Sequence, residues 1–221
     1  MQQTDATKPF QGARSGRVYR QRRYRGVFQR LVAWREQRLA SVLLSVPHAG
    51  CNGHIVDLPC GYGRFLPLLR RRDFRVTGMD QSQAMVDLYR QDEAFRDGRD
   101  HAERADVLEP LPVGAASARR VLCVRLFQHL HHGELRIRAL KTLANNRRQI
   151  VMTYYDDACL HYWTKRAVMR LKGRKVRVKM IPRRLFESEV AAAGLRVIKR
   201  VKLFPGVHAQ TWVVLAPAGN E

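Results

Sequence analysis

The sequence predicts an α/β fold: a doubly wound, mostly parallel seven-stranded sheet with an antiparallel C-terminal hairpin strand, plus an N-terminal helical extension. Two observations lead to this fold class. Short apolar runs alternate with helical segments between residues 54 and 155, which is typical of parallel strands joined by crossover helices. The chain then closes with two apolar runs joined by a Pro-Gly turn, which predicts a hairpin.

The individual elements follow from hydrophobic periodicity. A helical pattern runs from about Val18 to Val46, with apolar residues recurring at helical spacing. The helix after the fifth strand has Pro182 suited to its first position and Gly194 suited to the residue past its end. The other expected elements are strands at 54–58, 74–80, 101–107, 118–124, 148–155, 195–204 and 210–217, and helices at 62–72, 81–95, 132–146 and 182–195.

The bulk properties describe a basic chain without membrane spans. Its 221 residues suffice for one sizeable core, and no run of eighteen apolar residues exists to cross a bilayer. The four cysteines form no CxxC pair, which favours reduced thiols and a cytoplasmic protein and gives no support for a zinc site. The net charge of +22 and the excess of arginine favour an anionic partner.

The charge pattern divides the chain. We expect residues 1–48 to form a basic tail and helical extension, and residues 49–221 to form a Rossmann-like domain with a basic insertion at 157–184. Glu36 is the only acid between Arg14 and Arg38, and residues 164–184 contain none. In a helical reading of the insertion, Arg166, Arg170 and Arg174 share one face and are the candidate substrate-binding residues.

The stretch HIVDLPCGYGRF, residues 54–65, sets an acid beside a Gly-rich turn. Counting from Gly61, the third glycine of a dinucleotide fingerprint would be Leu66, so that fingerprint is incomplete. Asp57 would also repel a pyrophosphate, whereas it would attract a ligand with a cationic end, such as S-adenosylmethionine. Asp80 lies 23 positions further on, close to the offset at which an acid reaches ribose hydroxyls.

With these features the sequence resembles the class I S-adenosylmethionine-dependent methyltransferases. IVDLPCGYGR is similar to their first motif, VTGMDQSQAMV to their second, ERADVLEPLP to their third, and VLCVRLFQHL to the segment after strand four. The resemblance implies S-adenosyl-L-methionine as cofactor and S-adenosyl-L-homocysteine as product. The cofactor-binding residues that it implies are Asp57, Pro59, Gly61, Gly63, Asp80, Gln81, Met85, Asp106, Val107 and Arg125. Pro59 departs from the usual glycine and offers no N–H.

The reaction chemistry leaves several candidates open. Methyl transfer is an in-line displacement in which positioning supplies much of the catalysis, and a base is needed only where the acceptor must lose a proton. The candidates near the reacting end are His129 after strand four and Tyr154, Tyr155 and Asp156 at the end of strand five. Solvated histidines at a helix start are the alternative for the cluster that contains His129.

The sequence therefore predicts a methyltransferase for an anionic acceptor. One acceptor is a phosphorylated glycan or lipid-linked cell-envelope precursor, because DLPCGYGR is similar to small methyltransferases of bacterial surface-polysaccharide pathways, such as those for lipopolysaccharide. RNA is the second, favoured by charge, and a non-catalytic S-adenosylmethionine-binding regulator is a third reading. Peripheral membrane contact is compatible with the charge, and the oligomeric state stays open.

Overall fold

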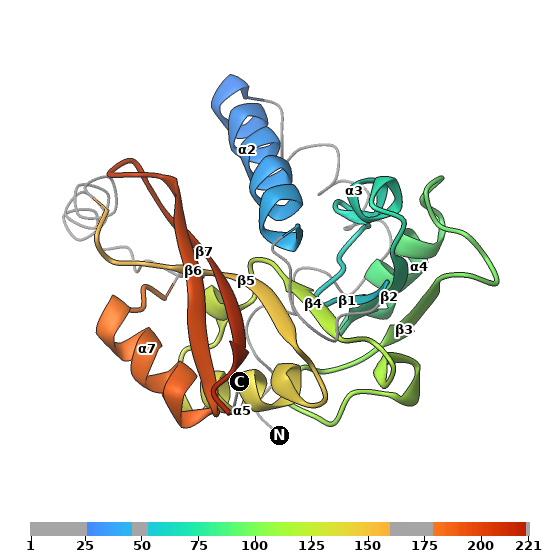
Figure 1. Cartoon of the computed structure of the whole chain (residues 1–221). Helices are drawn as coiled ribbons and strands as arrows, with labels where there is room; N and C mark the ends of the chain where they lie inside the picture. The colour runs from blue at the N-terminus through green and yellow to red at the C-terminus, as the bar shows by residue number, and fades with distance from the viewer. Residues whose placement is uncertain (1–25, 46–52, 160–178, 220–221) are drawn as a thin grey trace.

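A seven-stranded sheet forms the centre of the molecule. The computed structural model describes residues 26–45, 53–159 and 179–219 (Figure 1). The strand order is β3-β2-β1-β4-β5-β7-β6, and β7 runs antiparallel to both of its neighbours while the other pairs are parallel. The strands are β1 (His54–Asp57), β2 (Arg75–Asp80), β3 (His101–Arg104), β4 (Arg120–Cys123), β5 (Gln149–Tyr155), β6 (Leu195–Phe204) and β7 (His208–Pro217). The predicted fold class is confirmed.

The strand order reverses beside β1. The chain adds β2 and β3 on one side of β1 and then returns to add β4 and β5 on the other. In open α/β sheets, ligands bind at the carboxyl ends of the strands where the order reverses. Asp57 ends β1, and its strand partners are Gly78 in β2 and Leu122 in β4. The predicted Gly-rich turn therefore lies at this switch point.

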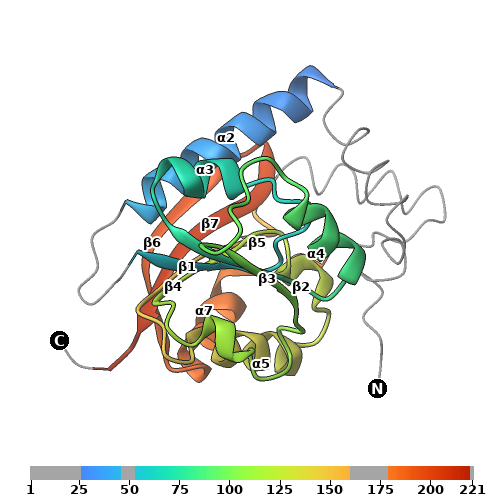
Figure 2. The ribbon, with the colours of Figure 1, turned by 90° about the vertical axis from the view of Figure 1, so that its right-hand side faces the viewer.

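Helices cover both faces of the sheet (Figure 2). On one face lie α2 (Val27–Leu44), α3 (Leu66–Arg71) and α4 (Gln83–Arg90), and on the other lie α5 (Gly133–Ala144) and α7 (Arg183–Ala192). Each face has its own cluster of buried apolar side chains, and Leu39 and Leu43 of α2 belong to the same cluster as Ile55 of β1. Helix α2 thus packs into the core of the sheet domain, where each buried leucine contributes about 1.5–3 kcal/mol.

Several helix boundaries differ from the predicted ones. The helix expected to reach residue 95 ends at Arg90, and the Asp92 carboxylate then accepts the Ala94 N–H at 3.1 Å in a local turn that competes with helix. Pro182 precedes the first helical residue of α7 and has an extended ψ of 143°. Gly194 follows this helix with a φ of 72°, as its predicted place past the end requires.

Candidate active site

The turn between β1 and α3 is held from both sides. The N–H of Leu58 donates to the Leu122 carbonyl at 3.0 Å, and the N–H of Cys60 donates to the Met79 carbonyl at 2.8 Å. The Leu58–Pro59 peptide bond is cis. Gly61 has a φ of 54°, and a Cβ built on it would meet nothing within 4 Å. The backbone therefore presents open space at Gly61, which a ligand could occupy.

Asp57 is a buried carboxyl group with an unused oxygen. Its side chain is almost inaccessible, and Oδ2 has no hydrogen-bond partner among the described residues. Burial raises the pKa of Asp57 to about 8; nearby Arg64 opposes this shift and Asp80 adds to it. A cation bound beside this group would favour its ionised form. The site therefore fits a ligand with a positively charged end.

Asp80 is fixed by backbone donors at the end of β2. Its Oδ2 accepts the N–H of Gly61 at 3.0 Å, and its Oδ1 accepts the N–H of Ser82 at 2.9 Å. Burial raises the pKa of Asp80, while these backbone hydrogen bonds oppose the rise. Asp80 thus links the glycine turn to the start of α4. Its carboxylate oxygens retain lone pairs that can accept hydroxyl donors.

A second acid lies beyond Asp80. The Gln81 amide donates to Asp106 Oδ2 at 2.8 Å, and the N–H of Leu108 donates to Asp106 Oδ1 at 2.9 Å. Met85 and Val107 are buried. The structure thus connects Gly61 with Asp80, and Gln81 with Asp106, across the carboxyl ends of β1, β2 and β3.

Arg125, just after β4, takes part in a network of hydrogen bonds and ion pairs. It has a φ of 64°, and its N–H donates to Thr153 Oγ1 at 2.8 Å. Its guanidinium group binds both carboxylate oxygens of Glu36 in α2, at 2.8 and 2.9 Å, and Arg64 of the glycine turn binds the same carboxylate. The contact of Arg125 with the cofactor carboxylate stays a prediction. In the structure its guanidinium group binds Glu36.

Sequence reasoning missed Glu36 and Arg64 as site residues. Glu36 is fully buried; burial would raise the pKa of Glu36, but Arg64 and Arg125 together lower it below its ordinary value. One signal was available, because Glu36 is the only acid in a long basic stretch and shares its helix face with Val32, Leu39 and Leu43. A lone acid on an apolar helix face needs a cationic partner.

The four catalytic candidates do not all lie together. Side chains alternate along a strand, so Tyr154 and Tyr155 point to opposite faces of β5. The Tyr154 ring is fully buried and stacks on Phe186 at 3.9 Å, its hydroxyl accepts a hydrogen bond from Arg200, and burial raises its pKa to about 12. Tyr154 is therefore placed as a core residue.

The other three candidates lie near the carboxyl edge of the sheet. Tyr155 is partly exposed, and its ring centroid lies 6.0 Å from that of His208. Asp156 is buried and accepts the N–H of Ala158 at 3.0 Å. His129 ends the 3-10 turn η3 (Phe127–His129) that follows β4, and it contacts Gln128 at 3.3 Å. Their catalytic roles stay predictions.

The comparisons with known proteins agree with this geometry. Residues 55–148 match the family model described as "Methyltransferase domain". These residues form a methyltransferase domain. The match begins in β1 and includes the glycine turn, Asp80 and Asp106. No curated protein sequence matches the chain.

Solved methyltransferases share the fold over nearly the whole chain. Magnesium protoporphyrin IX methyltransferase from Synechocystis PCC 6803 with bound S-adenosylhomocysteine is 14% identical, covers 96% of this chain and 98% of its own, and has a TM-score of 0.75. The CcbJ methyltransferase from Streptomyces caelestis is 14% identical, covers 83% of this chain and 90% of its own, and has a TM-score of 0.61. The Synechocystis enzyme has also been solved with bound S-adenosylmethionine; that structure is 12% identical to this chain and has a TM-score of 0.70.

The basic insertion of the methyltransferase begins and ends at the carboxyl edge of the sheet. Arg166, Arg170 and Arg174 lie outside the described residues. Before the insertion, the N–H of Asp156 donates to the Ala209 carbonyl at 2.9 Å. After it, the N–H of Lys179 donates to the Gln128 carbonyl at 3.1 Å, and the N–H of Ile181 donates to the Tyr155 carbonyl at 2.8 Å. The flank before the insertion therefore follows β5 and contacts β7, and the flank after it contacts η3 and the end of β5.

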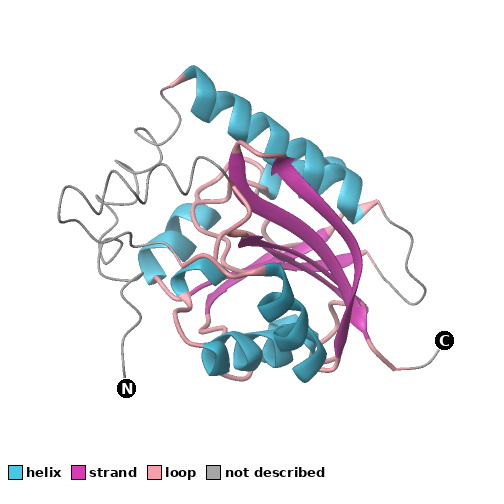
Figure 3. Ribbon diagram, turned by 90° about the vertical axis from the view of Figure 1, so that its left-hand side faces the viewer, coloured by secondary structure: helices cyan, strands magenta, loops and turns pink. Residues whose placement is uncertain are grey.

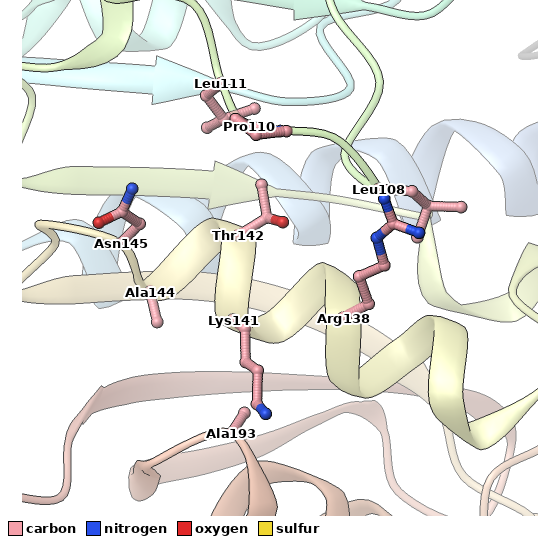
Figure 4. Close-up of a pocket in the computed structure, with 9 residues that line it drawn as sticks. All are labelled: Leu108, Pro110, Leu111, Arg138, Lys141, Thr142, Ala144, Asn145 and Ala193. Carbon is pink, nitrogen blue, oxygen red and sulfur yellow. The ribbon is translucent and has the colours of Figure 1, made fainter.

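A separate pocket of the methyltransferase lies along α5 (Figure 4). Its volume is about 540 Å³. The loop after β3, helix α5 with its C-terminal cap, and one residue after α7 line it: Leu108, Pro110, Leu111, Arg138, Lys141, Thr142, Ala144, Asn145 and Ala193. None of the predicted cofactor-binding or catalytic residues lines it. This pocket is distinct from the cluster around Asp57, Asp80 and Asp106.

Proposed function

We propose that this methyltransferase acts on an anionic acceptor, a phosphorylated glycan or lipid-linked cell-envelope precursor. The observation that carries the proposal is the position of the acid-free basic run at 164–184. Asp156 before this run, and Lys179 and Ile181 in its described part, adjoin the carboxyl edge, where His129 and Tyr155 also lie. Arginine suits phosphate groups because its planar guanidinium can donate two parallel hydrogen bonds.

The geometry of the turn supports the proposed roles of the cofactor-binding residues. Asp80 would accept the ribose hydroxyls, and Asp106 with Gln81 and Val107 would meet the adenine. Asp57 and the open space at Gly61 suit the methionine end, whose ammonium group would lie near the buried Asp57 carboxylate. When bound, S-adenosylmethionine supplies an electrophilic methyl group on its sulfonium. Gly63, Met85 and Pro59 would shape the surrounding walls.

At the acceptor end, the main task of the protein is to orient the acceptor atom toward the methyl group, and proton transfer is secondary. Tyr155 and Asp156 lie at the end of β5, and the Lys202 ammonium lies 3.7 Å from Asp156 Oδ2. His129 lies on the adjoining turn and would remove a proton where the acceptor carries a hydroxyl. Tyr154 has no place in this step, because it is enclosed on the opposite face of the strand.

Transfer of a labelled methyl group tests the acceptor class. The full chain is incubated with S-adenosylmethionine that carries a radioactive methyl group, together with separated RNA, lipid and polysaccharide fractions. We expect label in a lipid or polysaccharide fraction, and phosphatase treatment of that fraction should reduce the incorporation. Label confined to RNA, and removed by ribonuclease, would replace the proposed acceptor by RNA.

Charge reversal tests the basic insertion. Changing Arg166, Arg170 and Arg174 to Glu should raise the acceptor KM while leaving S-adenosylhomocysteine affinity unchanged. A matched variant reverses the exposed Arg71, Arg75 and Arg148, which lie toward the amino edge of the sheet, and should leave the KM near wild type. A compact acceptor with few phosphates should give a shallow salt dependence, whereas RNA gives a steep one. Equal KM values for both triple variants would contradict the proposed role.

A further inference from the structure

Helix α2 has a second apolar face. Val27, Leu31, Trp34 and Val42 recur at helical spacing and are 85%, 45%, 53% and 49% exposed, respectively. The opposite side of α2 carries the buried face with Val32, Leu39 and Leu43. A surface helix ordinarily has one apolar stripe toward the core and polar residues outward. We call the exposed set, together with Arg38, the outer stripe.

No other described helix or strand lies over the outward side of α2 (Figures 1 and 3). Arg38 interrupts the outer stripe, and its guanidinium carbon lies 5.6 Å from the Trp34 ring centroid. Arg30 flanks it and is exposed. The only acid of α2 is Glu36, which is buried on the other side. The outward side therefore combines apolar side chains with positive charge alone.

The outer stripe starts near the acceptor end of the site. The Phe28 ring centroid lies 6.3 Å from that of Phe204, and Arg35 Nε donates to the Leu203 carbonyl at 3.1 Å. Phe204 ends β6 and precedes the turn to β7. Strand β7 then pairs with β5, where Gln210 is the strand partner of Tyr155. Val207 on this turn is 54% exposed. The N-terminal half of α2 and this turn therefore adjoin one edge of the molecule.

We propose that the outer stripe docks the methyltransferase on an anionic lipid surface. A helix with exposed Trp and Leu among arginines matches the boundary between head groups and acyl chains, where arginine stems extend toward phosphates. A second copy of this chain is disfavoured as the occupant, because two stripes that carry only positive charge would repel. The inference rests on the proposed function in one respect: a lipid-linked acceptor would be presented at such a surface.

Vesicle binding tests the proposal without any acceptor. The full chain is sedimented with vesicles of mixed phosphatidylcholine and phosphatidylglycerol, or of phosphatidylcholine alone, at rising salt. We expect binding to the mixed vesicles, with a part that survives about 0.5 M salt because apolar burial is not screened. Brominated lipids should quench Trp emission in wild type and much less in Trp34→Gln. Vesicles without acceptor keep this result independent of the methyl-transfer assay.

Matched variants separate the outer stripe from general basic charge. Leu31→Gln with Trp34→Gln leaves the net charge unchanged and should lower the vesicle partition coefficient roughly tenfold or more. Val113→Gln removes another highly exposed apolar residue, in the connection between β3 and β4, and should bind as wild type does. S-adenosylhomocysteine affinity should be unchanged in both, which verifies folding. Equal partitioning of the two variants, or a wild-type dimer that the double substitution dissociates, would overturn the proposal.

Discussion

At the scale of single residues, one buried carboxylate connects three parts of the chain. Glu36 of α2 binds Arg64 of the glycine turn and Arg125 at the tip of β4. Glu36→Ala would leave both guanidinium groups without their shared anion in a poorly solvated place. We expect a loss of about 3 kcal/mol in the free energy of unfolding, measured by urea denaturation.

The matched variant for this prediction is Glu93→Ala, because Glu93 is exposed. Its change should stay within about 0.5 kcal/mol. Similar stability of Glu36→Ala and Glu93→Ala would show that the network adds nothing to folding. Glu36→Gln keeps the shape of the side chain and tests whether the charge itself is needed.

Asp57 gives the stability a defined pH dependence. Its pKa is raised to about 8, so between the ordinary value and 8 the folded state holds a proton that the unfolded state has lost. Stability from this group is therefore full at low pH and falls as pH rises toward 8. Urea denaturation at pH values from about 7 to 8.5 should show this fall in wild type and not in Asp57→Asn.

The chosen pH window avoids an opposing group. Burial lowers the pKa of His54 to about 4, so the unfolded state binds more protons there and stability rises with pH up to about 6.5. Above that value the His54 contribution is constant. Parallel curves for wild type and Asp57→Asn above pH 7 would mean that Asp57 is ionised in the folded protein.

At the scale of elements, β2 and α4 meet through a glycine that sequence reasoning passed over. A Cβ at Gly78 would lie 2.5 Å from Cε1 of Tyr89, whose ring is fully buried. Gly78→Ala would force α4 away from the sheet, and we expect a loss of about 1–3 kcal/mol in unfolding free energy. Chemical denaturation measures it.

Gly53→Ala is the matched control, because a Cβ there meets nothing within 4 Å. It should leave the stability near wild type. Adding Tyr89→Leu to Gly78→Ala should recover part of the loss, since the smaller side chain can withdraw. If the loss of unfolding free energy in the double variant equals or exceeds the sum of the losses in the two single variants, the cause lies in the strand backbone and not in the contact with Tyr89.

At the scale of the whole molecule, binding of the cofactor at the switch point should raise the free energy of unfolding of the sheet domain. S-adenosylhomocysteine at a hundred times its Kd should add about 2.7 kcal/mol to the free energy of unfolding. For a chain of this length, the thermal midpoint should rise by roughly 2–4 °C for each kcal/mol. Differential scanning calorimetry with and without the ligand measures this shift.

Two variants locate the origin of the shift. Asp80→Ala should weaken binding by roughly 1–3 kcal/mol, the range for hydrogen bonds to a charged group. Gly61→Val should abolish the shift, because its side chain would enter the open space of the turn and strain a φ of 54°. Circular dichroism establishes that each variant is folded, and an undiminished shift in folded Gly61→Val would place the cofactor elsewhere.

Local patterns in the sequence were enough to predict the fold class, the order of the elements and the place of the glycine turn. Strand and helix periodicities are local properties. Asp57, Asp80 and Asp106 lie at or just after the carboxyl ends of strands, and these ends must share one edge of a parallel sheet. The helix ends were less predictable, because a local hydrogen bond such as that of Asp92 decides them.

The contacts between side chains that are distant in sequence could not be predicted, because they depend on how the elements pack. Tyr154 and Tyr155 are adjacent in sequence, yet packing against Phe186 places one in the core and leaves the other partly exposed near the candidate site. Glu36 and Arg125 are 89 positions apart, and no local pattern relates them. Their pairing depends on burial. A carboxylate that is removed from water is stable only beside a positive charge, and the fold decides which residue supplies that charge.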